Sequence, residues 1–190
     1  MSISEKIYIK RRFVVRSLHD RIAPAKNRFD IREICHENIA DAAWFNTPEQ
    51  LDCFHQFLEN GYKGYFVYIE GEVAHRIWIF TDSKRSILAE GFVYKIEPNV
   101  IVAWVLTSEK YRGKGIYPHM LAYLKSVFRP KFIYGVVEPE NFTSIKGFLK
   151  TGFEIYQKFV LIRFYRIKLW VQYQKQGKLS FRLGIGSVVS

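Results

Sequence analysis

The chain has 190 residues, of which 48% are hydrophobic and 17% aromatic, and this composition excludes a disordered or low-complexity protein. No stretch reaches the roughly 18 apolar residues of a membrane span, and the first residues lack the apolar core of a secretory signal, so we expect a cytoplasmic protein. The net charge of +11 indicates attraction to a polyanion (nucleic acid, an anionic membrane surface or a phosphorylated ligand), although a solvated cationic face would give the same charge.

The positive charge is concentrated at the two ends of the chain. Residues 1–28 contain eight Lys or Arg and two acids, and residues 155–190 contain seven Lys or Arg and no acid. We therefore expect a basic N-terminal arm over 1–27, one globular domain over 28–165 and a basic C-terminal extension over 166–190.

The first predicted elements are a strand and two short helices. Residues 29–34 alternate between apolar and polar, which predicts a strand. Residues 36–60 predict two helices, because Thr47 is a good N-cap that is followed by Pro48 and completes a capping box with Gln50.

The next elements alternate between strands and helices. In chain order, they are a hairpin over 65–81 that turns at Glu70-Gly71, a strand over 100–107, a helix over 115–128, a strand over 132–137, a helix over 141–150 and a β-rich stretch from 153 to 170. This order predicts a mixed α/β fold.

The sequence YRGKGIY, at residues 111–117, joins a predicted strand to a predicted helix. Backbone N–H groups at the start of a helix form an anion site, and glycines let a phosphate approach the backbone. Arg112 and Lys114 supply cations at its rim. The loop is therefore suited to a pyrophosphate.

Two common nucleotide fingerprints do not fit this loop. A P-loop needs Ser or Thr for a magnesium ion, but no hydroxyl follows Gly115 at the required place. The dinucleotide fingerprint needs a third glycine where Pro118 stands. We also expect no metal site, because Cys35 and Cys53 have no C-x-x-C spacing and no His/Cys cluster around them.

Two motifs together resemble those of the GCN5-related N-acetyltransferase family. The stretch VLTSEKYRGKGIY is similar to its acyl-CoA motif R-x-x-G-x-G, with Arg112 and Gly115 at the first two fixed positions. About 25 residues later, EPENFTSIKGFLKTGFEIY is similar to its second motif, through Asn141, Ser144, Phe148, Lys150, Gly152 and Phe153. The resemblance covers roughly residues 28–165 and implies a mixed, mainly antiparallel central sheet with helices on both faces.

The resemblance also implies an activity: direct transfer of an acetyl or other acyl group from acetyl-CoA to a primary amine, without a covalent enzyme intermediate. The cofactor would lie between strands 100–107 and 132–137, and N–H groups near Val105 and Leu106 would hold the pantetheine and polarise the thioester carbonyl. The implied cofactor-binding residues are Val105, Leu106, Thr107, Arg112, Gly113, Lys114, Gly115, Ile116, Tyr117, Asn141, Ser144 and Phe148.

Two positions depart from the family pattern. Tyr117 stands where the first motif has a final Gly or Ala, so tight contact with the pyrophosphate is in question. Phe148 stands where many members carry the Tyr that protonates the departing thiolate, and Phe has no proton to donate. Tyr156 or Tyr134 could take over this role.

The general base has three candidates. An amine must be neutral to attack, so a carboxylate or a histidine is expected within reach of it. His75 on the hairpin, Glu97 before strand 100–107 and Glu138 after strand 132–137 are the candidates, and His75 titrates nearest to neutral pH. A structural, hydrogen-bonded His75 is the alternative.

The acceptor and the partners follow from weaker signals. RGKGIY and the VAHR hairpin resemble bacterial acetyltransferases encoded with surface-polysaccharide pathways, which implies an amino-sugar acceptor. FVLIRFYRIKLW, at residues 159–170, suits peripheral contact with an anionic membrane, whereas the lack of stacking motifs argues against nucleic acid. The alternative function is a non-catalytic module of the same fold that binds a polyanion or a membrane through its basic flanks.

Overall fold

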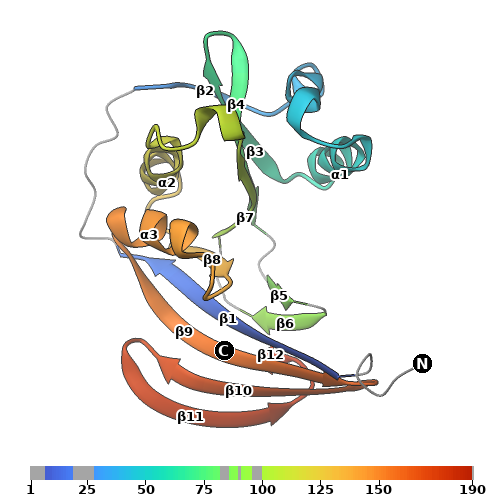
Figure 1. Cartoon of the computed structure of the whole chain (residues 1–190), viewed down its shortest axis with the longest axis vertical. Helices are drawn as coiled ribbons and strands as arrows, with labels where there is room; N and C mark the ends of the chain where they lie inside the picture. The colour runs from blue at the N-terminus through green and yellow to red at the C-terminus, as the bar shows by residue number, and fades with distance from the viewer. Residues whose placement is uncertain (1–6, 19–27, 82–85, 90, 96–99, 190) are drawn as a thin grey trace.

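The computed structural model of the chain describes residues 7–18, 28–81, 86–89, 91–95 and 100–189 (Figure 1). Its elements in chain order are β1 (Ile7–Ser17), β2 (Asp30–Glu33), η2 (Ile39–Phe45), α1 (Pro48–Glu59), β3 (Lys63–Ile69), β4 (Glu72–Phe80), β5 (Ser86–Ala89), β6 (Phe92–Lys95), β7 (Val100–Thr107), η3 (Glu109–Tyr111), α2 (Ile116–Val127), β8 (Ile133–Val137), α3 (Phe142–Lys150), β9 (Phe153–Phe164), β10 (Ile167–Lys175), β11 (Lys178–Ile185) and β12 (Val188–Val189).

The main sheet has nine strands in the order β11-β10-β9-β1-β8-β7-β4-β3-β2. Its neighbouring strands are antiparallel except for β7 and β8, which are parallel. Helices α2 and α3 lie on one face of this sheet and α1 lies on the other (Figure 1). The predicted mixed, mainly antiparallel sheet with helices on both faces is confirmed.

Apolar side chains fill both faces of the sheet. Leu121 and Leu124 of α2 are fully buried in the cluster on the α2 and α3 face, and Phe54 of α1 packs on Trp78 of β4 on the opposite face. A second, three-stranded sheet, β12-β6-β5, contributes to a third cluster. There Tyr94 of β6 packs against Phe159 of β9.

Helix α1 begins as its sequence predicts. The Thr47 hydroxyl accepts a hydrogen bond from the Gln50 N–H, and the Gln50 side chain accepts one from the Thr47 N–H, which completes the capping box with Pro48 in the first turn.

None of the helices in the described part of the chain combines the length and apolarity that a bilayer crossing requires.

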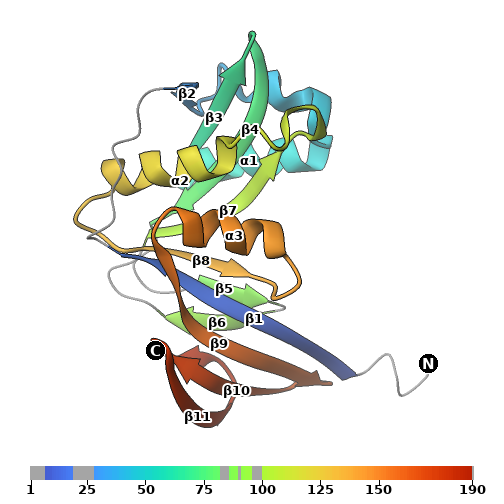
Figure 2. The same cartoon turned by 60° about the vertical axis from the view of Figure 1, so that its left-hand side comes forward.

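The N-terminal part of the chain differs from the expected arm. Within the range 1–27, Ile7–Ser17 forms β1, which lies between β8 and β9 in the main sheet (Figure 2). Val14 and Val15 of this strand are completely buried. The run Phe-Val-Val has the β-branched and aromatic character of a buried strand, and it outweighs the cations around it. Four of these cations, Lys10, Arg11, Arg12 and Arg16, therefore belong to the sheet.

The C-terminal residues also extend the sheet. Much of the range 166–190, expected as a basic extension, forms β10, β11 and β12. β10 pairs with β9 and β11 pairs with β10, so β11 is an edge strand. The hairpin β5–β6 was not predicted either.

Candidate functional site

The parallel strands β7 and β8 stay together for only part of their length. Their register pairs Val100 with Ile133 and ends with Val102 opposite Gly135. Beyond this point β7 continues on β4 and β8 continues on β1. Among the described strands, the carboxyl-terminal half of β7 therefore has a partner on one side only. Its backbone N–H and C=O groups on the side of β8 are not paired with a strand.

A β-bulge lies in this half of β7. The register against β4 shifts between Arg76 and Trp78, and Trp104 has a left-handed φ of 51°. Trp104 and Val105 thus stand opposite one residue of β4, which interrupts the hydrogen-bond ladder. Leu106 resumes the pairing opposite Arg76. Of the two expected backbone contacts, Val105 lies in the bulge and Leu106 lies beyond it.

A buried arginine supports the bulge. Arg76 Nη1 donates to the Trp104 carbonyl and Nε donates to Asn46 Oδ1 at 2.5 Å. Asn46 in turn donates to the carbonyl of Ala42 in η2 at 2.7 Å. Among the described residues, no carboxylate forms an ion pair with Arg76, and burial lowers its pKa to about 10. The hydrogen bonds connect η2 with the bulge in β7, and no pattern in the sequence indicates them.

The glycine-rich loop precedes α2 with an open N-terminus. Gly113 and Gly115 have left-handed φ angles of 80° and 76°, and a Cβ atom at either position would have no neighbour within 4 Å. Gly115 is the N-cap residue and makes no side-chain capping bond, so the first N–H groups of α2 are available to an anion. Ile116, the first helical residue, is buried in the core.

The two cations of the loop lie on the surface. Arg112 Nη1 pairs with Glu109 at 2.9 Å and its Nε lies 3.4 Å from the Thr107 carbonyl. The Lys114 ammonium lies 4.9 Å from the ring centroid of Tyr111. Both residues precede the open N-terminus of α2 in the chain, and a phosphate group bound there would compete for their side chains with these contacts.

Tyr117 points from α2 to α3. Its hydroxyl lies 3.3 Å from Ser144 Oγ, and a Cβ atom added to Gly147 would lie 2.6 Å from its ring. Its ring also contacts Phe148 edge to face, with centroids 5.7 Å apart. Burial raises the pKa of Tyr117. The ring therefore fills the space between the two helices, and Gly147 is the sequence signal that could have indicated this packing.

The residues of the second motif have structural partners. Asn141 caps α3 by accepting a hydrogen bond from the Ser144 N–H at 3.0 Å. Phe148 is buried against β8, where a Cβ atom on Gly135 would lie 2.6 Å from its ring tip. The Phe148 ring thus makes the contact surface between α3 and β8 apolar at Gly135.

His75 lies in the core rather than on an open surface. Its side chain is fully buried, Nδ1 lies 2.8 Å from the Thr107 hydroxyl, and Nε2 has no hydrogen-bond partner. Burial, with a smaller effect of the Arg76 charge, lowers the pKa of His75 to about 3. A neutral, enclosed imidazole matches the structural alternative better than the role of a base for a bound amine.

The other acid–base candidates are not close together. Glu138 follows the carboxyl end of β8, where it is exposed and pairs with Arg12 at 2.9 Å. Tyr156 lies near the amino end of β8, where the Arg16 guanidinium stacks 4.3 Å from its ring centroid and the Tyr134 ring centroid is 5.9 Å away. Glu97 lies outside the described residues.

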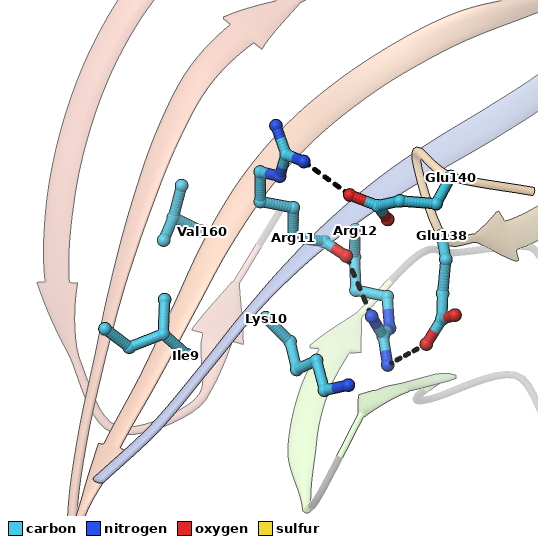
Figure 3. A pocket seen from close by; sticks show the side chains of 7 residues that line it. All are labelled: Ile9, Lys10, Arg11, Arg12, Glu138, Glu140 and Val160. Carbon is cyan, nitrogen blue, oxygen red and sulfur yellow. Dashed lines mark hydrogen bonds and ion pairs between the residues drawn. The ribbon is translucent and has the colours of Figure 1, made fainter.

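Glu138 is one of the residues that line a charged groove (Figure 3). It has a volume of about 400 Å³ and is lined by Ile9, Lys10, Arg11, Arg12, Glu138, Glu140 and Val160. Arg11 pairs with Glu140 and Arg12 with Glu138. β1 pairs with β8 only from Phe13 onward, so the groove follows the edge of β1 beyond the end of β8. The sequence predicts these cations on an arm outside the domain, so it gives no sign of the groove.

Comparison with known proteins identifies the fold. No family model and no curated protein matches the sequence. A GNAT-family acetyltransferase of Colwellia psychrerythraea superposes with a TM-score of 0.60 at 14% identity, over 83% of this chain and 57% of that protein. This chain thus spans less than two thirds of that protein's length.

Two further structures have the same arrangement. The glucosamine N-acetyltransferase region of a fungal β-N-acetylglucosaminidase superposes with a TM-score of 0.57 at 15% identity, over 85% of this chain and 22% of that protein. An aminoglycoside 6′-N-acetyltransferase of Acinetobacter haemolyticus superposes with a TM-score of 0.51 at 15% identity, over 66% of this chain and 90% of that protein. The chain therefore has the fold of the GCN5-related N-acetyltransferases.

Proposed function

We propose that the protein transfers an acetyl or other acyl group from acyl-CoA to a primary amine. The observation that carries the proposal is the divergence of β7 from β8 beside the bulge at Trp104, together with the open N-terminus of α2. This arrangement offers backbone hydrogen bonds to an extended amide chain and an anion site at the end of that chain.

The residues present fit an acyl-CoA. The N–H groups at the start of α2, with Arg112 and Lys114, would hold the pyrophosphate in the open space at Gly113 and Gly115. The backbone around Val105 would hold the pantetheine. When bound, the thioester supplies an electrophilic carbonyl and a thiolate leaving group. Tyr117 narrows the space between α2 and α3, so its ring would lie against the pantetheine or move aside.

The groove of Figure 3 is suited to the acceptor. Lys10 and Arg12 on its wall attract a phosphorylated or otherwise anionic molecule, and the Glu138 carboxylate can take the proton of its ammonium group directly or through water. Two of the neighbours above are named as a glucosamine N-acetyltransferase region and an aminoglycoside 6′-N-acetyltransferase, and these names support the proposal of an amino-sugar acceptor.

Calorimetric titration with acetyl-CoA, CoA and a pantetheine fragment tests the cofactor. We expect micromolar binding that depends on the phosphates and disappears in Gly115→Trp. Gly61→Trp is the matched control, because Gly61 also has a left-handed φ, 74°, and no neighbour within 4 Å of its Cβ position. Equal loss in both variants, or no binding by the folded wild type, would reject the assignment of the loop.

Thiol release from acetyl-CoA tests the reaction. Glucosamine and glucosamine 6-phosphate are the first acceptors to compare, and we expect the phosphorylated amine to have the lower KM because of the cationic groove. Release that does not depend on any amine would indicate hydrolysis instead of transfer.

A non-catalytic module of this fold is the second candidate. The observation in its favour is that Tyr117, His75 and Phe148 are all engaged in packing. This alternative predicts no acetyl-CoA binding by the wild type or by Tyr117→Gly. Salt-dependent binding to polyanions would remain.

A further inference from the structure

One face of the sheet formed by β1, β9, β10 and β11 is apolar and open. The register places Ile9, Ile162, Leu169 and Ile185 side by side across the four strands. Phe181 and Leu183 point to the same side as Ile185, because alternate residues of a strand share a face. We call the surface defined by these six side chains the open face.

The opposite side of the same strands is covered. Phe159 and Leu161 of β9 and Trp170 of β10 are buried in the cluster that includes β6. By contrast, Leu183 is 71% exposed and Phe181 is 81% exposed. β11 is the outermost strand of the molecule, and α2 and α3 lie over the other part of the sheet (Figures 1 and 2). Within the described ranges, the open face therefore has no cover.

The apolar exposure is concentrated rather than scattered. Eight of the fourteen large hydrophobic side chains that are exposed in the described part of the chain belong to β1, β9, β10 and β11. The largest apolar patch of a typical monomer measures about 300–600 Å² and often marks an interaction site. An exposed apolar surface on four adjacent strands points to a binding partner.

The charges around the open face identify the partner. Arg166 lies in the turn between β9 and β10, Lys175 is the last residue of β10 and Lys178 is the first residue of β11. No acid occurs from residue 155 to residue 190. At the β1 end of the face, beside Ile9, the carboxylates Glu140 and Glu138 are paired with Arg11 and Arg12. A second copy would bring two cationic rims together, and nucleic acid would leave the apolar side chains in water. An anionic lipid surface can bury the apolar side chains and attract the cations around them.

We propose that the open face docks on the surface of an anionic lipid bilayer. Phe181, Leu183 and Ile185 enter the headgroup layer, while Lys175 and Lys178 contact lipid phosphates. This inference rests on strands away from the loop before α2. The open face shares Ile9 with the groove of Figure 3, but the inference does not depend on the proposed acyl transfer.

Co-sedimentation of the full chain with vesicles tests the docking. Vesicles of phosphatidylcholine mixed with phosphatidylglycerol are compared with vesicles of phosphatidylcholine alone. We expect binding to the anionic vesicles, and weaker binding as the salt concentration rises. Absence of binding to anionic vesicles, or equal binding to both kinds at all salt concentrations, would overturn the proposal.

Two double variants separate the apolar contribution from the charge. Phe181→Glu with Leu183→Glu should weaken binding about tenfold or more, because carboxylates would face the lipid. Lys175→Gln with Lys178→Gln should also weaken it about tenfold and reduce its salt dependence. Phe142→Glu is the matched control, since Phe142 is 69% exposed but lies on α3, and it should bind like the wild type.

Circular dichroism checks that all variants are folded, and analytical ultracentrifugation tests the alternative occupant. Unchanged vesicle binding by the Phe181 and Leu183 double variant would reject the open face as the lipid contact. A dimer that dissociates in this double variant, without vesicle binding by the wild type, would assign the face to a second copy of the chain.

Discussion

The burial of His75 makes the stability of the protein depend on pH. Burial lowers its pKa from 6.5 to about 3 in the folded chain. As the pH falls below 6.5, His75 binds a proton in the unfolded chain but stays neutral in the folded chain. The free energy of unfolding therefore decreases by about 1.4 kcal/mol per pH unit. Between pH 7 and pH 5 the free energy of unfolding falls by about 2 kcal/mol. Above neutral pH, His75 is neutral in both states and no longer changes the stability with pH.

Urea unfolding followed by tryptophan fluorescence measures this effect. The matched variant is His75→Asn, whose side-chain amide can keep the hydrogen bond to the Thr107 hydroxyl but does not titrate. We expect the wild type to lose about 2 kcal/mol more than the variant between pH 7 and pH 5. His119, whose pKa is also lowered by burial, titrates in both proteins and cancels in the difference. Identical pH profiles would show that His75 is not enclosed.

Three other substitutions address the bulge, the phosphate site and the groove. Arg76→Met should lower the free energy of unfolding by about 3 kcal/mol, because the Trp104 carbonyl loses a charged donor; urea unfolding would contradict this if stability were unchanged. Arg112→Ala should weaken acetyl-CoA binding by about 1–3 kcal/mol in calorimetry, and an equal loss for a pantetheine fragment without phosphates would contradict the assigned contact. Glu138→Gln should lower kcat/KM about 100-fold near neutral pH without changing acetyl-CoA affinity, and an unaltered pH–rate profile would remove Glu138 as the base.

The elements that the sequence predicted correctly are those specified by local chemistry. The capping box at Thr47 uses hydrogen bonds within one turn, and the glycine-bounded start of α2 follows from the left-handed positions Gly113 and Gly115. Signals of this kind depend on neighbours in the chain, so a single sequence contains all that is needed to find them.

The features that were missed depend on distant partners. β1 was taken as an arm because its cations are obvious in the sequence, whereas its place between β8 and β9 depends on residues more than 100 positions away. Arg76 is buried through contacts to Asn46 and Trp104, each about 30 residues away. No periodicity marks such a residue. His75 was attractive as a base for its ordinary pKa, but the packing of α2 and β7 around it decides its chemistry.

The position of β1 also determines the order in which the sheet can assemble. Ser17 pairs with Phe153, and Phe13 pairs with both Val137 and Lys158, so the first strand of the chain needs partners that a ribosome adds much later. Until then its apolar side chains have no sheet to join, and contacts of such long sequence separation form slowly. During synthesis, the N-terminal strand is therefore a candidate for chaperone binding. A label or a fusion placed close before Ile7 would therefore act on a step of folding that follows the synthesis of β8 and β9.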